Sequence, residues 1–510
     1  MIIKKYDNKK KYTFGCVITA YNRSKITSET IKSINDSFIP NDLLFIVMDD
    51  NSTEDMKFDL KNDHIIIKKD NNYGVANSLV AGWDLAYAMD IPFLLNLDSD
   101  VAVSRNWLCK ILSTYHNFIK AEKDQCVITG FNGQNHNVLK KHDDYLTKES
   151  IGGINLFFSK DNYPIIRKSL TNNVGLIKNR KEIIKSIPRY GKNPIIHSEY
   201  LIDVITKKGL DPQKSANGWD WSLVSICESE NIRMICTKPS VVQHTAKGLH
   251  NFYNNKYEKS VDFRNQSIVP KIIHQTWKSD NIPKHLKQMQ KTVINNNKSF
   301  NYKLWTDIQI DKFIKKNYPE IWNFYNSYEY IIQKIDFARL LILYHFGGIY
   351  IDLDTVCFGN LECVRQYPVT LIKTKKHPLF TDYDYVLNNA FIAAESKNIF
   401  IENCINNAMS FDVKKMKPIQ GMNIEYSKVL CSAGPLMVTK THMDYNYKGM
   451  INIFDDNFYH GIEKKPNQNG VKLAKDTKKK LENCKMIHVH ESSWWKDKNN
   501  KTKIPDKNRS

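Results

Sequence analysis

Several features that would identify a class of protein are missing from this sequence of 510 residues. The amino terminus, MIIKKYDNKKKYTFGCVITAY, has no apolar run long enough for a signal peptide or a membrane span, and no later segment reaches that length. The ten cysteines lie far apart without any C-x-x-C pair, so neither a zinc site nor a dense disulfide framework is expected. These absences predict a protein of the reducing cytoplasm with no membrane span.

Acidic residues are scarce relative to basic ones, because 74 Lys and Arg oppose 54 Asp and Glu and give a net charge of +20. Clustered basic residues bind nucleic acid by releasing counterions from its phosphates. Here the basic residues are mostly lysines spread along the chain, and zinc-finger spacing, an RNP motif and a convincing helix-turn-helix pattern are all absent. We therefore expect a solvated lysine surface and no nucleic-acid partner.

Apolar residues are plentiful, at 42% of the chain, which is ample for packed cores. The length suits two large domains. A polar, irregular stretch runs from about His250 to Val269, and Pro270 then precedes a fresh apolar run. We predict a first domain over residues 1–255, a linker over 256–269, a second domain over 270–496 and a basic tail over 497–510.

Short apolar runs alternate with amphipathic stretches in both halves, which predicts α/β domains with a mostly parallel sheet covered by helices. Helices are expected over residues 76–87, where apolar side chains recur at helical spacing, and from about Tyr330 to Tyr344. The expected strands are Phe14–Thr19, Leu43–Met48, His64–Ile67, Phe93–Leu97, Cys126–Thr129, Lys271–Gln275, Tyr302–Trp305 and Ile349–Ile351.

Polar residues follow three strands of the first half, in the segments TAYNR from Thr19, DDNS from Asp49 and DSD from Asp98. Ligands of open α/β sheets bind beyond the carboxyl ends of the strands. Two carboxylates one residue apart, such as Asp98 and Asp100, can hold a hard divalent cation that also binds diphosphate oxygens. Because an isolated acidic turn usually just faces water, the neighbouring segments decide the interpretation.

The ordered segments VITAYNR, VMDDNSTED, NYGVANSLVAGWDLA and LLNLDSD resemble the family 2 inverting glycosyltransferases, which have the GT-A fold. The resemblance covers roughly residues 13 to 250 and implies a nucleotide-sugar donor. It implies that Thr19 and Asp50 contact the nucleobase with Asp49 alongside, that Asp100 is the principal metal ligand, and that Asp98 supports the ribose or the metal.

Two later segments extend this resemblance. Asp220, in NGWDWS, matches the place of the general base, a carboxylate within reach of the acceptor hydroxyl; capping of a helix that starts near Trp221 is the alternative. His244, in VVQHT, matches a histidine that completes the coordination of Mn²⁺, and a purely structural histidine is the alternative.

The second half contains the segments VPKIIHQTW, IDFARLLILYHFGGIYIDLDT, SAGPLMVT and IHVHESSWW in that order. Asp336 and Arg339 are three apart on the expected helix and share a face in an apolar segment, where buried charges need partners. They could pair with each other or reach the turn at Gly347-Gly348, where glycines permit close backbone approach. The following strand brings Asp352 and Asp354 to its carboxyl end.

These segments resemble the DXD sugar-transferase family, glycosyltransferase family 32, which includes fungal mannosyltransferases and consists of retaining GT-A enzymes. The resemblance implies that Asp354, with Asp352, binds the metal. It implies donor contacts by Asp336, Arg339, Asp352, Asn389 and Trp277, although Trp277 could equally lie in the core. The closing segment would complete the metal and diphosphate site through His490, ranked before His488, and through Ser493 and Trp494.

Together the resemblances predict two GT-A (Rossmann-like) nucleotide-sugar-binding domains in tandem. The expected protein is a bifunctional glycosyltransferase that uses Mn²⁺ (or Mg²⁺) and UDP- or GDP-sugars to modify a glycan or glycoprotein acceptor. Its N-terminal domain would invert and its C-terminal domain would retain configuration. Two alternatives are a chain in which one domain is catalytic and the other binds acceptor, and a nonenzymatic protein that binds carbohydrate or nucleic acid.

Overall fold

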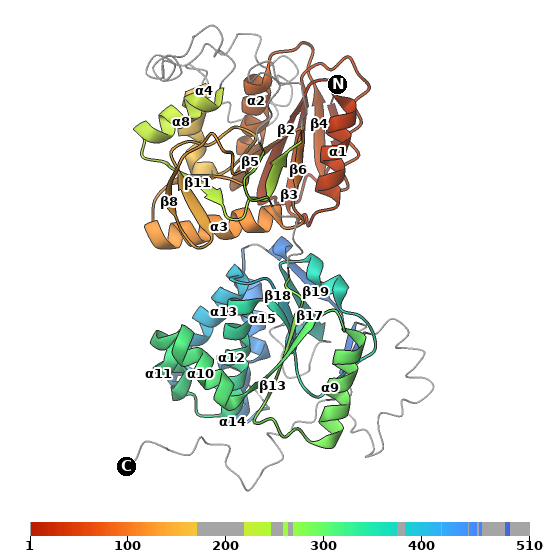
Figure 1. Cartoon of the computed structure of the whole chain (residues 1–510), viewed down its shortest axis with the longest axis vertical. Helices are drawn as coiled ribbons and strands as arrows, with labels where there is room; N and C mark the ends of the chain where they lie inside the picture. Colours follow the sequence, from red (N-terminus) through yellow and green to blue (C-terminus); the bar gives the residue numbers. More distant parts are fainter. Residues whose placement is uncertain are drawn as a thin grey trace. The chain divides into compact units, whose positions relative to one another are not determined.

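The computed structural model describes residues 2–170, 219–245, 259–263, 269–374, 383–419, 421–446, 448–455, 458–461 and 485–489. The chain divides into two compact units, Met1–Gln266 and Ser267–Ser510, and this division falls within the stretch 256–269 assigned to a linker. In each unit helices cover a mixed β-sheet, so the predicted α/β class is confirmed (Figure 1). Among the described helices, none is long and apolar enough to cross a lipid bilayer.

The N-terminal unit is built on a ten-stranded sheet in the order β1-β4-β3-β2-β5-β10-β7-β11-β9-β8. Its centre is parallel, because β2 pairs with β3 and β5 and β3 pairs with β4. The strands are β1 Ile2–Lys5, β2 Phe14–Ala20, β3 Leu43–Asp49, β4 His64–Lys68, β5 Phe93–Asp98, β7 Cys126–Thr129, β8 Val138–Lys141, β9 Tyr145–Lys148, β10 Asn155–Ser159 and β11 Arg233–Thr237. A separate antiparallel pair joins β6 (Val101–Val103) to β12 (Val242–His244).

Helices pack on both faces of this sheet. On one face α2 (Val75–Ala88), α4 (Tyr163–Leu170) and α8 (Trp219–Ser229) share a buried core with alternate strand residues such as Val17. Gly82 of α2 brings helix and sheet so close that a Cβ there would lie 2.6 Å from Val17 Cγ1. On the other face lies α3 (Trp107–Glu122), whose Tyr115 ring contacts Phe93 and Phe157. Helix α1 (Ser24–Asn35), also among the described residues, packs against β6.

The C-terminal unit has a six-stranded sheet in the order β14-β13-β15-β18-β17-β19. Strand β13 lies parallel to β14 and β15, whereas β18 runs antiparallel to β15 and β17. The strands are β13 Ile272–Trp277, β14 Asn301–Thr306, β15 Gly348–Ile351, β17 Val369–Thr374, β18 Val386–Ala394 and β19 Ile451–Phe454. A small second sheet consists of β16 Thr355–Cys357, β20 Tyr459–Gly461 and β21 Met486–His488.

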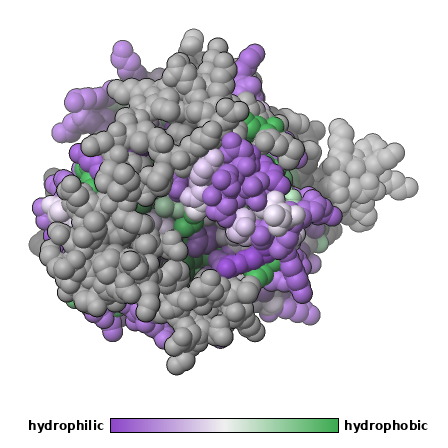
Figure 2. All heavy atoms as spheres, turned by 90° about the horizontal axis from the view of Figure 1, so that it is seen from above, coloured by the Kyte–Doolittle hydropathy of each residue, from purple (hydrophilic) through white to green (hydrophobic). Residues whose placement is uncertain are grey.

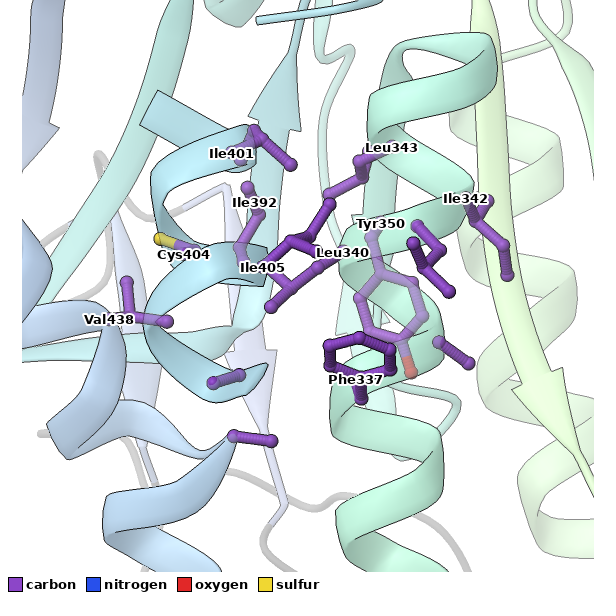
Figure 3. Close-up of a cluster of buried hydrophobic side chains, with 14 of the residues drawn as sticks. Phe337, Leu340, Ile342, Leu343, Tyr350, Ile392, Ile401, Cys404, Ile405 and Val438 are labelled. Atoms are coloured by element: carbon purple, nitrogen blue, oxygen red, sulfur yellow. The ribbon is translucent and has the colours of Figure 1, made fainter. Parts of the chain in front are cut away.

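Most helices of this unit lie on one side of the sheet, with α9 (Lys284–Asn296) on the other (Figure 1). That larger group consists of α10 Asp307–Asn317, α11 Trp322–Ser327, α12 Ile331–Phe346, α13 Ile399–Ser410, α14 Ile424–Ser432 and α15 Pro435–Asp444. Figure 3 shows the core between α12 and its neighbours, where Phe337 and Leu340 meet Tyr350, Ile392 and Ile405. Full burial of each such side chain stabilises the fold by about 1.5–3 kcal/mol.

The eight predicted strands correspond to β2, β3, β4, β5, β7, β13, β14 and β15, which begin and end within two residues of the predicted bounds. Helices α2 and α12 occupy the predicted helical segments, whereas the other described strands were not among the eight predicted. The turn between α12 and β15 also forms as predicted. Gly347 and Gly348 have φ values of 63° and 103°, and a Cβ on Gly348 would lie 2.6 Å from the carbonyl oxygen of Ile272. Only glycine fits this close approach, which sets where β15 and the acidic residues after it begin.

Among the described residues that Figure 2 colours, hydrophilic side chains predominate, with small hydrophobic patches between them. This is the surface expected of a chain in which 25% of the residues are charged.

Candidate functional site

Three side chains that can bind a metal converge beyond the carboxyl end of β15. They are Asp352, Asp354 and His488, and one ligand atom from each lies within 4.8 Å of the others. His488 Nε2 is 3.0 Å from Asp354 Oδ1 and 3.8 Å from Asp352 Oδ2. Strand β21 places His488 there by pairing with β16 opposite Thr355. Two carboxylates and an imidazole suit Mn²⁺, so the donor set fits the predicted cofactor.

The carboxylate of Asp352 is held by protein donors on one oxygen. The Tyr350 hydroxyl donates to Oδ1 at 3.0 Å, and Arg339 Nη2 lies 3.4 Å from the same oxygen. The other oxygen, Oδ2, faces His488. Backbone bonds fix the loop as well, since Asp352 N–H donates to the Ala390 carbonyl at 2.8 Å. The loop therefore presents a defined edge of Asp352 to the candidate metal site.

The sequence left open whether Arg339 pairs with Asp336 or reaches toward the segment after the glycine turn, and the Arg339 side chain does both. Its Nη2 lies 2.7 Å from Asp336 Oδ1, and it also reaches Asp352. Its Nη1 donates to the Asn389 carbonyl, and its guanidinium stacks 4.5 Å above the Tyr350 ring. These ion pairs and hydrogen bonds offset the desolvation cost of burying the Arg339 guanidinium. The guanidinium in turn adds a fixed positive charge beside the acidic cluster.

The pKa values of the cluster reflect burial and crowded negative charge. Burial raises the pKa of Asp336 to about 7, with the Asp352 charge adding and the Arg339 charge opposing. Burial also raises the pKa of Asp352, helped by Asp354 and opposed by Arg339. For His488, burial lowers the pKa, but the hydrogen bond and charge of Asp354 outweigh it and the net shift is upward. A divalent cation would relieve the repulsion between these carboxylates.

The two other predicted donor contacts in this unit lie at the same edge. Asn389 of β18 is buried, and its side chain lowers the pKa of Asp336. Trp277, at the end of β13, is only partly buried and packs against a small cluster that includes Leu353, the residue between the two metal-site aspartates. Its indole is thus packed on one part and exposed on the rest, and a donor contact by Trp277 stays a prediction.

The closing segment is described only as far as Val489. His490, Ser493 and Trp494 lie outside the described residues. His488 contacts Asp354, and the ranking of His490 before His488 stays a prediction because His490 is not among the described residues. Val489 packs in the Leu353 cluster, and its backbone N–H donates to the Asp354 carbonyl at 3.0 Å.

The N-terminal unit gathers a second acidic cluster beyond β5. Asp100 is buried, and its Oδ2 lies 3.2 Å from Arg23 Nη1 and 3.3 Å from His244 Nε2. His244 arrives through the pairing of β12 with β6, where it lies opposite Val101. The structure therefore brings together Asp100 and His244, two of the three residues predicted as metal ligands of this unit, and it adds Arg23, which the sequence analysis did not single out.

Asp98 and Asp220 belong to the same cluster. Burial raises the pKa of Asp98 well above its usual range, the charges of Asp100 and Asp220 add to this, and Arg23 opposes it. Asp220 lies in the first turn of α8, which begins at Trp219 rather than near Trp221 as expected. The Trp219 ring lies on Gly153, where a Cβ would come within 2.3 Å of Trp219 Cζ2. This contact packs Trp219, the residue before Asp220, against the backbone of Gly153.

Asp50 is already engaged with protein groups at the start of α2. Its carboxylate accepts from Gly74 N–H at 2.7 Å, Tyr73 N–H at 3.1 Å and Ser78 Oγ at 3.1 Å, and the buried Lys69 Nζ lies at 3.4 Å. A carboxylate is stabilising at this end of a helix. These bonds position α2, so a nucleobase contact by Asp50 stays a prediction.

Thr19 and Asp49 lie at the ends of the neighbouring strands. Thr19 pairs with Asp98 across β2 and β5, while Asp49 is opposite Ala20 and accepts from Ser52 N–H at 2.8 Å. Both are buried at the carboxyl edge of the sheet. The predicted donor residues of this unit therefore share one edge, although nothing in the structure shows which of them contacts a donor.

The residues that sequence reasoning missed are Arg23, Lys69, Tyr350 and Thr276. Arg23 has a left-handed backbone conformation, with φ of 61°, which turns its side chain toward Asp100. No sequence pattern signals such a turn at an arginine. Tyr350 could have been found, because it lies two residues before Asp352 and alternate strand residues share a face.

Each unit thus places carboxylates and a histidine at the carboxyl ends of central strands, where α/β enzymes bind their ligands. Comparison with known families finds one match in each unit. Residues 16–175 match glycosyl transferase family 2, and residues 283–372 match the glycosyltransferase sugar-binding region containing the DXD motif. The chain therefore carries a family 2 glycosyltransferase domain followed by a DXD-containing glycosyltransferase region, as the two resemblances predicted.

Curated relatives are glycosyltransferases of yeasts and a virus. The chain is 31% identical over 185 residues to inositol phosphoceramide mannosyltransferase 2 of Schizosaccharomyces pombe, which covers 36% of this chain and 49% of that protein. It is 42% identical over 113 residues to inositol phosphoceramide mannosyltransferase 3 of the same yeast, covering 22% and 32%. An uncharacterized glycosyltransferase L373 of Acanthamoeba polyphaga mimivirus is 32% identical over 142 residues, covering 24% and 57%.

The chain thus spans about half or less of the length of the first two of these relatives. Among solved structures, the PaToxG glycosyltransferase is similar over 34% of this chain and 69% of that chain, with 19% identity and a TM-score of 0.27.

Proposed function

We propose that this chain is a bifunctional, metal-dependent glycosyltransferase that takes sugars from nucleotide-sugar donors. The observation that carries the proposal is the cluster of Asp352, Asp354 and His488 beside the buried Arg339, within a region that matches the DXD sugar-binding family. Because the relatives named above include mannosyltransferases, mannose is the first sugar to test for the C-terminal unit. A glycan or glycoprotein is the proposed acceptor, and a cytoplasmic location without a nucleic-acid partner stays a prediction.

In the C-terminal unit, Asp352, Asp354 and His488 would hold Mn²⁺ or Mg²⁺. The bound cation would neutralise negative charge on the departing diphosphate. Arg339 adds a fixed positive charge that needs no rearrangement during the reaction. A retaining transfer of this kind needs no general base from the protein, because the departing diphosphate can take the acceptor's proton while the site supplies orientation.

In the N-terminal unit, Asp98, Asp100 and His244 would hold the cation and Asp220 would act as the general base of an inverting transfer. The electrostatic coupling of Asp98 to both Asp100 and Asp220 supports this placement, because it requires the three carboxylates to lie near one another. A base in that position would accept the proton of the attacking hydroxyl. If instead one unit is catalytic and the other binds acceptor, loss of the metal ligands should abolish turnover in one unit only.

The test is release of nucleoside diphosphate from a panel of UDP- and GDP-sugars by the full chain with Mn²⁺. We expect Asp354→Ala to abolish one activity and Asp100→Ala the other, each by at least about a hundredfold, because each removes a ligand of one metal site. Asp412→Ala, which changes an exposed aspartate of the C-terminal unit, is the matched control. Loss of all turnover in one variant and none in the other would leave a single catalytic unit. No turnover of any donor by the unmodified chain would reject the proposal.

A further inference from the structure

Three consecutive residues of β13 bind the segment that leads from α12 to the metal site. His274 Nε2 is 2.9 Å from the Gly347 carbonyl oxygen, Gln275 Nε2 donates to the Asp352 carbonyl at 3.2 Å, and Thr276 Oγ1 is 2.8 Å from Tyr350 Oη. Neighbouring residues of a strand point to opposite faces. Strand β13 therefore holds this segment from both sides.

The direction of the bond between Thr276 and Tyr350 follows from the charge of Asp352. An ionised carboxylate only accepts hydrogen bonds, so the single hydroxyl proton of Tyr350 goes to Asp352 Oδ1, 3.0 Å away. The Tyr350 oxygen must then accept in its contact with Thr276. Thr276 is the donor, and the chain of hydrogen bonds runs from Thr276 through Tyr350 to Asp352.

This chain of bonds acts on the orientation of the Asp352 carboxylate. With Oδ1 bound by Tyr350 and near Arg339, rotation of the carboxylate would break both contacts. The oxygen Oδ2 is therefore kept on the side of His488, 3.8 Å from its Nε2. The Tyr350 ring is itself fully buried beneath the Arg339 guanidinium, so it has little freedom to move.

A second set of bonds fixes the backbone of the same residue. Gln275 is fully buried, and its Oε1 accepts from Tyr302 Oη at 2.9 Å. Gln290 Nε2 in turn donates to Tyr302 Oη at 2.8 Å. Because the Gln275 oxygen is occupied by a donor, its amide nitrogen points to the Asp352 carbonyl. The carboxylate and the backbone of Asp352 are thus held by separate residues.

We propose that Thr276 is a positioning residue of the C-terminal site. Its hydroxyl, acting through Tyr350, holds the Asp352 carboxylate so that Oδ2 is presented to a divalent cation together with Asp354 and His488. The inference rests on the proposed cation-dependent function, and it concerns a residue that does not itself touch the cation. Groups that orient metal ligands by hydrogen bonding, without touching the metal, contribute about 10–100-fold to metal affinity or activity.

The test compares Thr276→Val, which keeps the shape of the side chain but removes the hydroxyl, with Thr276→Ser, which keeps the hydroxyl. The full chain also carries Asp100→Ala, so that Mn²⁺ binding reports on the C-terminal site. The matched control is Thr370→Val, because Thr370 is a buried strand threonine whose hydroxyl donates to the Val364 carbonyl at 3.3 Å. Mn²⁺ affinity is measured by calorimetry without any sugar donor, and folding by thermal unfolding.

We expect Thr276→Val to weaken Mn²⁺ binding about tenfold, with Thr276→Ser and Thr370→Val close to the parent chain. In turnover assays, excess Mn²⁺ should restore most of the kcat of Thr276→Val, which a general packing defect would not allow. Tyr350→Phe removes the same chain of bonds from its middle. The double variant Thr276→Val/Tyr350→Phe should therefore bind Mn²⁺ no more weakly than Tyr350→Phe alone. If Thr276→Val does not fold, Tyr350→Phe alone tests the inference.

A folded Thr276→Val chain that binds Mn²⁺ like its parent would overturn the inference, as would equal weakening by Thr276→Ser. Absence of Mn²⁺ binding at this site in the parent chain would also overturn it. A parent that binds Mn²⁺ but turns over no nucleotide sugar would reject the proposed function and leave the positioning role of Thr276 standing, provided the affinities differ as expected.

Discussion

At the scale of single residues, His274 shows how a buried titratable group can serve the architecture in its neutral form. Trp305 Nε1 donates to its Nδ1 at 3.1 Å, so the ring proton is on Nε2 and is donated to the Gly347 carbonyl 2.9 Å away. Both ring nitrogens are thus satisfied without a positive charge. Burial lowers the pKa of His274 to about 4. The neutral histidine ties β13 to the glycine turn before the metal site.

This arrangement predicts that the C-terminal unit loses stability as the pH falls from about 6.5, the ordinary histidine pKa, to about 4. In that window the unfolded chain binds a proton that folded His274 does not, so protonation favours unfolding. The loss amounts to at most about 3 kcal/mol. Urea unfolding at several pH values checks it, and His274→Gln should show a shallower dependence. Identical pH dependence of the two chains would show that another group is responsible.

At the scale of elements, the contact of Gly153 with Trp219 positions the first turn of α8 relative to the N-terminal acidic cluster. A Cβ on Gly153 would lie 2.3 Å from the Trp219 ring, whereas a Cβ on Gly152 would come no closer than 3.2 Å to His136 Nε2. The Trp219 ring also contacts Trp83 of α2, with 6.4 Å between ring centroids. A small side chain at position 153 must therefore displace Trp219 and with it the turn that carries Asp220.

We expect Gly153→Ala to lower the turnover of the N-terminal unit about tenfold or more, because a displaced base is poorly aligned with the acceptor hydroxyl. Gly152→Ala is the control and should keep turnover near that of the parent, since the His136 side chain can move aside. Steady-state kinetics with the donor that Asp100→Ala fails to use would measure both. Equal turnover of the two alanine variants would contradict the prediction and show that the contact between Gly153 and Trp219 does not control the position of Asp220.

At the scale of the whole molecule, each unit has a hydrophobic core of its own. Leu340 of α12 belongs to the core of the C-terminal unit, and Leu79 of α2 belongs to that of the N-terminal unit. Both side chains are almost completely buried. Stability should therefore be largely a property of each unit, because removal of core atoms costs free energy where they are lost.

Leu340→Ala is expected to lower the stability of the C-terminal unit by about 2–5 kcal/mol and to leave the N-terminal activity unchanged after mild heating. Leu79→Ala should have the reverse effect. Residual activity of each unit after incubation at a series of temperatures measures this directly. Parallel loss of both activities in either variant would mean that the two units unfold together.

The sequence by itself determined the central strands, helices α2 and α12, and the carboxylates of the candidate metal site, because these depend on local patterns. Short apolar runs placed the central strands to within two residues, and the glycine pair with the strand after it placed Asp352 and Asp354. In the N-terminal unit the resemblance to family 2 glycosyltransferases was enough to associate Asp100 with His244, and the two side chains do meet.

Only the tertiary structure decided which partners these residues have. Alternation along a strand would give positions 488 and 490 the same face and so could not choose between them. The pairing of β21 with β16 is what brings His488 to Asp354. The start of α8 at Trp219 and the reach of Arg23 to Asp100 depend on contacts with distant residues and on a left-handed turn. The hydrogen bonds from Thr276 to Asp352 likewise cross between strands far apart in the chain. Such contacts arise from packing, which leaves no periodic signal in the sequence.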